Sequence, residues 1–167
     1  MSLLLCWLIL LAACQPVTQT SVPIVPLPDQ TPPLPSQAKL DLINFFVYLN
    51  HGKYDQAVPL YGGSFEQLQD WNPELDPVDK AGLLKAGCEM NGLQCLQLYS
   101  ADLITQPSDL EFVYTVTYRN PDNSQFVRGP CCGATETEMP SVTKFEVHVS
   151  CTREGVCQIL DLPPYVP

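Results

Sequence analysis

The chain has 167 residues, with 8 basic and 18 acidic side chains and a formal net charge of -10. This length fits one domain of ordinary size, roughly 100 to 150 residues, with short accessory segments. The few Lys and Arg residues are scattered among more than twice as many carboxylates. Binding to nucleic acid needs clustered positive charge against the phosphates, so a nucleic-acid partner is disfavoured.

The N-terminus is an apolar run. Leu3–Ala13 contains no charged side chain, and it is about half of the roughly 20 residues that a helix needs to cross a bilayer. This length and position are typical of the h-region of a secretory signal peptide. The alternative is a buried apolar segment of the folded protein.

The run ends in Leu11-Ala12-Ala13-Cys14, which resembles the lipobox of bacterial lipoproteins. The resemblance implies that residues 1–13 are a signal peptide that is removed, and that the thiol of Cys14 carries a diacyl group. Cys14 would then be the first residue of the mature protein. Two or three acyl chains suffice for stable anchoring to a membrane. The first two residues depart from the pattern because they include no Lys or Arg.

A proline-rich segment follows. Residues 15–36 contain seven prolines and no aromatic residue, a composition that favours disordered or polyproline-like chain. Residues 14–36 are therefore predicted to be a lipidated tether that holds the following domain away from the membrane. A ligand for an SH3-type groove is the alternative for such a segment.

Residues 37–167 have the composition of a folded domain, and its first half has helical spacing. Ser36 is the expected N-cap of a helix that ends at Asn50-His51-Gly52, where Gly suits a left-handed conformation. The apolar positions of this helix are Leu40, Ile43, Phe46, Val47 and Leu49. A short second helix is expected over residues 54–60. A third is expected to begin with Asp76 as its cap and Pro77 in its first turn, and to end at Gly87.

The second half has the two-residue period of strands. Strands are predicted over residues 96–104, 111–119, 143–150 and 156–162, with a turn at residues 105–109. Helices followed by an antiparallel meander indicate an α+β domain, with helices packed on one face of the sheet.

The helix-turn-helix sequence INFFVYLNHGKYDQAVPLYGG, residues 43–63, resembles the opening of bacterial domains of the nuclear transport factor two-like type. That resemblance implies a cone-shaped fold of nuclear transport factor two-like or cystatin-like architecture, in which helices cover a curved antiparallel sheet of about four strands. Some members of this fold hold a small ligand or an active site inside the cone, and others bind partners. Helical repeat proteins use a similar turn, but the predicted strands argue against them.

Six cysteines remain after Cys6 and Cys14 are assigned to the signal peptide and the lipid. An even number in an exported chain is typical of disulfides. Cys151 and Cys157 flank a five-residue hairpin loop and are the favoured pair, and Cys88 and Cys95 are candidates to close a second loop around Asn91-Gly92. Cys131 and Cys132 would either bridge each other directly or each reach one of the Cys88 and Cys95 thiols. The spacings fit neither a zinc site nor a Cys-x-x-Cys redox motif.

The candidate pocket residues lie on the predicted strands. Phe112, Tyr114 and Tyr118 share one strand face, and His148 is on the polar side of another strand. Sheet core is the simpler interpretation of the aromatic strip, and a solvent-exposed surface is the simpler interpretation of His148. If the sheet curves into a cone, the tyrosine hydroxyls become polar groups for a small apolar ligand. No catalytic, cofactor or metal-binding motif is present.

These observations predict an extracytoplasmic lipoprotein of the cell envelope, anchored through Cys14 to the outer face of the cytoplasmic membrane or to the outer membrane. Its domain is expected to bind an unidentified protein or small molecule and to have no enzymatic activity. The alternatives are a small enzyme of the same fold that uses Tyr114 and His148, and a structural component of the envelope.

Overall fold

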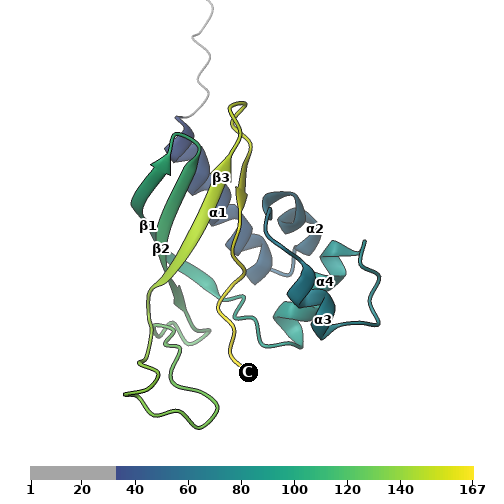
Figure 1. Ribbon diagram of the computed structural model, residues 1–167, viewed down its shortest axis with the longest axis vertical. Helices are drawn as coiled ribbons and strands as arrows, with labels where there is room; N and C mark the ends of the chain where they lie inside the picture. Colours follow the sequence, from purple (N-terminus) through teal and green to yellow (C-terminus); the bar gives the residue numbers. More distant parts are fainter. Residues whose placement is uncertain (1–32) are drawn as a thin grey trace, which may run out of the picture. The chain divides into compact units, whose positions relative to one another are not determined.

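The computed structural model describes residues 33–167 (Figure 1). The predicted signal peptide, Cys14 and nearly all of the tether lie outside the described residues. Among residues 33–167, no helix is both long and apolar enough to cross a membrane. The elements in chain order are α1 (Leu34–Asn50), α2 (Tyr54–Ala57), η1 (Val58–Leu60), α3 (Glu66–Trp71), α4 (Lys80–Glu89), β1 (Gln97–Ser108), β2 (Glu111–Arg119), β3 (Phe145–Cys151) and β4 (Cys157–Ile159).

Helix α1 begins two residues before the predicted cap. Pro33 is the N-cap residue, and its carbonyl accepts hydrogen bonds from the backbone N–H groups of Ser36 and Gln37 at 2.8 and 3.1 Å. The prediction of Ser36 as the cap was therefore wrong, because Ser36 is already inside the first turn. The buried stripe consists of Ala38, Leu42, Phe45, Phe46 and Leu49. It includes the predicted Phe46 and Leu49 but not Leu40, Ile43 or Val47, so it is rotated only in part from the predicted one.

The end of α1 is as predicted. Gly52 has a φ of +67°. Its N–H donates to the carbonyl of Leu49, and the N–H of Lys53 donates to the carbonyl of Tyr48 at 2.8 Å. This pair of bonds is a Schellman motif, which satisfies the last carbonyls of the helix and turns the chain into α2.

Helix α4 begins three residues later than predicted. The carboxylate of Asp79 accepts a hydrogen bond from the N–H of Gly82 at 2.8 Å and caps the helix. Asp76 instead accepts from the N–H of Val78 in the preceding turn, so its prediction as the cap was wrong. The helix continues through Gly87, where a Cβ atom would lie 2.8 Å from side-chain atoms of both Leu68 and Leu93. Gly87 therefore permits close packing rather than ending the helix. Helix α3 was not predicted.

The four strands form one antiparallel sheet in the order β1-β2-β3-β4. Strand β2 has the predicted bounds. Strand β1 extends to Ser108, so most of residues 105–109 is strand and not turn, and Thr105 pairs with Val113. Strand β4 is shorter than predicted. The observed topology confirms the α+β class with an antiparallel meander.

The core lies between α1 and one face of the sheet. The buried face of β2 consists of Phe112, Tyr114, Val116 and Tyr118, and it includes the three aromatic residues predicted to share a face. The rings of Phe46 on α1 and Tyr118 pack edge to face with centroids 5.4 Å apart, a favourable aromatic geometry. Helices α2, α3 and α4 lie beyond the β4 edge of the sheet (Figure 1). Gly62 connects them to that edge, since its N–H donates to the carbonyl of Ile159 at 2.9 Å.

Two disulfides close short loops of the domain. Cys151 and Cys157 are paired residues of β3 and β4, and Cys88–Cys95 links the end of α4 to the segment before β1. The first is the pair that the sequence favoured, and the second is the candidate pairing around Asn91-Gly92. Cys131 and Cys132 are unpaired within residues 33–167, and because Cys88 and Cys95 bond to each other, neither of the adjacent cysteines reaches them.

Candidate functional site

The four residues proposed from the sequence as a pocket do not come together. Phe112, Tyr114 and Tyr118 are fully buried under α1. The register of β2 and β3 pairs Val113 with His148 and Tyr114 with Val147, so His148 lies on the opposite face of the sheet from Tyr114. This arrangement corrects the pocket hypothesis. It also separates the two residues suggested for an enzyme of this fold.

The hydroxyls of the two core tyrosines have different surroundings. The Tyr114 hydroxyl donates a hydrogen bond to the carbonyl of Pro35 at 3.0 Å. The Tyr118 hydroxyl is buried with no hydrogen-bond partner among the described residues. Burial raises the pKa of both phenols, and for Tyr118 the negative charge of Asp161 raises the pKa further. Both rings are therefore neutral parts of the core.

His148 forms a pair with Asp161 on the surface. Its Nδ1 atom lies 2.9 Å from a carboxylate oxygen of Asp161, and its backbone N–H donates to the same oxygen at 2.6 Å. Both side chains are largely exposed, at 52% and 41%. The pair joins β3 to the segment after β4 at the surface.

Two hollows of the domain lie on either side of the C-terminal segment, residues 165–167. This segment is held against the α4–β1 connection. The N–H of Val166 donates to the carbonyl of Gly92 at 3.0 Å, and the N–H of Gln94 donates to the carbonyl of Pro164 at 2.8 Å. Tyr165 also forms an isolated antiparallel bridge with Leu93. The segment thus forms a wall common to both hollows.

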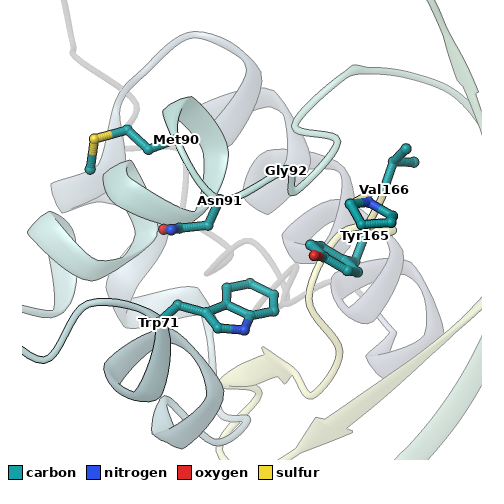
Figure 2. Close-up of a pocket in the computed structure, with 7 residues that line it drawn as sticks. Trp71, Met90, Asn91, Gly92, Tyr165 and Val166 are labelled. Atoms are coloured by element: carbon teal, nitrogen blue, oxygen red, sulfur yellow. The ribbon is translucent and has the colours of Figure 1, made fainter. Parts of the chain in front are cut away.

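The smaller hollow has a volume of about 340 Å³ and lies between α3, the end of α4 and the C-terminal segment. Figure 2 shows the rings of Trp71 and Tyr165 side by side, with the Asn91 amide near them. The ring centroids are 4.9 Å apart. Asn91 is held by the buried Asn72, whose amide donates to its Oδ1 atom at 3.0 Å. The two rings are inclined by 32° and together form one wall of this hollow.

The larger cavity has a volume of about 630 Å³. It lies between the C-terminal segment and the long connection from β2 to β3, which extends from one end of the sheet (Figure 1). Its walls are mostly apolar, and Arg128, Gln94 and two thiols add polar groups. The lining residues are Gln94, Phe126, Val127, Arg128, Gly129, Pro130, Cys131, Cys132, Met139, Tyr165, Val166 and Pro167.

The β2–β3 connection is held in place at its base. The N–H of Phe126 donates to the carbonyl of Tyr118 at 2.9 Å, and Arg128 and Val142 exchange two backbone hydrogen bonds. The ring of Phe145 stacks on the ring of Phe126, and the guanidinium of Arg128 lies 5.5 Å from the centroid of the Phe145 ring. These contacts fix the wall that carries Val127 and Arg128.

Two carboxylates hold the tip of the same connection. Glu138 accepts hydrogen bonds from the backbone N–H and the hydroxyl of Thr135, and Glu136 accepts one from the N–H of Ser141 at 2.9 Å. These bonds favour the ionised carboxylates and lower the pKa of both side chains. The tip is therefore ordered by charged groups at neutral pH.

The sequence contained only a weak signal of this cavity. Val127 and Met139 are apolar side chains within a connection otherwise rich in turn residues, and both are exposed. These two side chains line a cavity because the C-terminal segment packs opposite them. Within residues 33–167, no group of three or more His, Cys, Asp or Glu side chains is placed to hold a metal ion.

Comparisons with protein-family models, with the sequences of curated proteins and with solved structures found no match to this chain.

Proposed function

We propose that this chain is an exported lipoprotein, anchored through Cys14, whose domain binds a small apolar molecule in the larger cavity. The observation that carries the binding proposal is the cavity of about 630 Å³ with mostly apolar walls. Small-molecule sites have volumes of roughly 300 to 1,000 Å³ and combine such walls with a few polar groups. Arg128 is a cation in a chain of net charge -10, so it favours a ligand that carries an acceptor or a negative charge.

The export proposal is supported by the cysteine pairs. Disulfides persist in oxidising compartments outside the cytosol, and two of them close loops in this domain. The apolar run that ends at Cys14 resembles a secretory signal peptide, which would direct the chain to such a compartment.

The finer fold assignment is also a proposal. A nuclear transport factor two-like domain is supported by the Schellman turn at Gly52 between α1 and α2 and by the position of α1 on one face of a four-strand meander. The inner face of the sheet is filled by aromatic side chains, so the proposed ligand site lies at the end of the sheet.

The ligand site is tested with anilinonaphthalene sulfonate, a fluorescent probe with apolar rings and a negative charge. The full chain should bind the probe, and Val127→Asp should weaken binding by about tenfold or more because it places a carboxylate in the apolar wall. The matched control is Val156→Asp. Val156 is exposed to a similar extent, 58% against 48% for Val127, but lies in the β3–β4 turn. Equal affinities of the two variants would contradict the proposed site.

The anchor is tested separately by growth of an expressing bacterium with labelled palmitate. The wild-type chain should take up the label and Cys14→Ser should not. Cys6→Ser is the control because it alters a thiol of the same leader outside the lipobox-like sequence. Labelling of the Cys14→Ser variant would exclude Cys14 as the acylation site, whatever the result for the cavity.

A further inference from the structure

Cys131 and Cys132 lie closer together than two unbonded sulfur atoms normally do. Their Sγ atoms are 2.7 Å apart. Non-bonded carbon atoms, which are smaller than sulfur, pack best at about 3.5 to 4.0 Å, and a disulfide bond is about 2.05 Å long. The φ of Cys132 is +61°, an uncommon conformation for a residue with a side chain. The backbone of the connection therefore holds the two thiols in contact, at a separation slightly longer than a covalent bond.

These two residues are also the cysteines of the described domain that carry free thiols. Cys132 is exposed and Cys131 is half-buried, and both line the larger cavity. In contrast, Cys151 and Cys157 are buried at 5% and 1% exposure, and Cys88 and Cys95 are already bonded to each other. A small molecule that enters the cavity can reach the adjacent pair first.

We propose that Cys131 and Cys132 form a reversible vicinal disulfide by thiol–disulfide exchange with a low-molecular-weight disulfide. A bond between adjacent residues closes a small ring that contains their planar peptide group, which strains the bond and makes it easier to reduce. Exposed and strained disulfides are the labile ones. The pair is thus a two-electron redox centre, distinct from the two structural disulfides. The redox reaction does not require a ligand bound in the cavity.

The exchange has two steps. The thiolate of the exposed Cys132 attacks the disulfide RSSR, forms a mixed disulfide and releases RS⁻ as the leaving group. The sulfur of Cys131, after loss of its proton, then attacks the Cys132 sulfur and releases the second RS⁻. Two electrons pass from the cysteine sulfurs to RSSR, and the two thiol protons end on two RSH molecules. The hydrogen bond with Cys132 raises the pKa of the Cys131 thiol, so Cys131 keeps its proton until Cys132 has reacted and loses it only in the second step.

The test follows the tryptic peptide of residues 129–144, which contains both cysteines. The full chain is equilibrated without denaturant in buffers of reduced and oxidised glutathione, then quenched and alkylated for mass spectrometry. The peptide should change between a form with two alkyl groups and a form with none. Reduction of the Cys131–Cys132 bond should need a lower ratio of reduced to oxidised glutathione than reduction of Cys88–Cys95 or Cys151–Cys157. The two ratios should differ on the order of a hundredfold.

The single variants Cys131→Ser and Cys132→Ser provide the matched controls. Each leaves one thiol without its neighbour, so each should retain glutathione as a stable mixed disulfide on this peptide, whereas the wild-type peptide should not. The proposal is overturned if the wild-type peptide keeps two alkylatable thiols in the most oxidising buffer. It is equally overturned if the wild-type peptide accumulates glutathione adducts or bonds to another cysteine of the chain.

Discussion

Individual hydroxyl groups in the core of this domain differ in their contribution to stability. Tyr114 and Tyr118 belong to the same strand face, and both rings are fully buried. Only the Tyr114 hydroxyl has a hydrogen-bond partner among the described residues, the carbonyl of Pro35. A buried polar group without a partner loses its bonds to water and gains nothing in exchange.

Tyr118→Phe should therefore stabilise the protein by about 1 kcal/mol, whereas Tyr114→Phe should destabilise it by about 1 kcal/mol. The two substitutions remove the same atom from the same strand face, so each serves as the control for the other. Urea unfolding followed by circular dichroism measures both. A loss of stability in Tyr118→Phe that equals the loss in Tyr114→Phe would show that the Tyr118 hydroxyl is bonded.

The cap of α4 offers a second comparison between single residues. Asp79→Ala should lower the free energy of unfolding by about 1 kcal/mol because the N–H of Gly82 loses its acceptor. Asp76→Ala, which removes a carboxylate from the turn before the helix, should cost less. Urea unfolding distinguishes them, and a larger effect at Asp76 would restore the cap that the sequence suggested.

At the scale of the elements, the β2–β3 connection depends for its order on ionised carboxylates. Glu136 and Glu138 hold its tip through hydrogen bonds that lower the pKa of both groups from 4.5. A lowered pKa in the folded state stabilises the tip above pH 4.5, and this stabilisation is lost as pH falls through the lowered pKa.

Acidification should therefore release the tip of the connection while the sheet stays folded. NMR signals of the Thr135 and Ser141 amides should move toward unbonded values as pH falls below 4.5. In Glu138→Gln the response of the Thr135 amide to pH should be lost, whereas Glu154→Gln, in the β3–β4 turn, should leave it unchanged. A Thr135 signal that does not move in the wild-type chain would contradict the role of Glu138.

At the scale of the whole molecule, buried phenols make the fold sensitive to alkaline pH. Burial raises the pKa of Tyr61 to about 12, with a smaller contribution from the charge of Asp161, and burial also raises the pKa of Tyr114 and Tyr118. These phenols ionise more readily in the unfolded chain. Their contribution to stability is complete below the ordinary pKa of 10.0 and is lost as pH rises toward the raised values.

The urea midpoint should consequently fall as pH rises from 10 to 12. Tyr61→Phe removes one of the groups responsible, so its midpoint should fall less steeply over this range. Circular dichroism at a series of pH values measures both proteins. A midpoint of the wild-type chain that stays constant across the range would mean that the phenols are equally easy to ionise in the folded and unfolded states.

Features that depend on a few consecutive residues were predicted correctly from the sequence, and features that depend on distant parts of the chain were not. The alternation of β2 and the left-handed turn at Gly52 each depend on a few consecutive residues, and the structure has both. Competing local signals caused the errors at helix starts. Ser36, Asp76 and Asp79 are all good caps in isolation, and the helices begin after Pro33 and Asp79.

By itself, the sequence determined the α+β class, the buried face of β2 and the Cys151–Cys157 loop, because each of these depends on spacing within a short stretch of chain. The structure selected Cys88–Cys95 from the pairings that the sequence left open. Only the tertiary structure decided that His148 and Tyr114 lie on opposite faces and that the larger cavity exists. The walls of that cavity come from Gln94, residues 126–139 and residues 165–167. Segments so far apart in sequence meet only when the sheet register and the C-terminal hydrogen bonds are formed, and no local pattern contains that information.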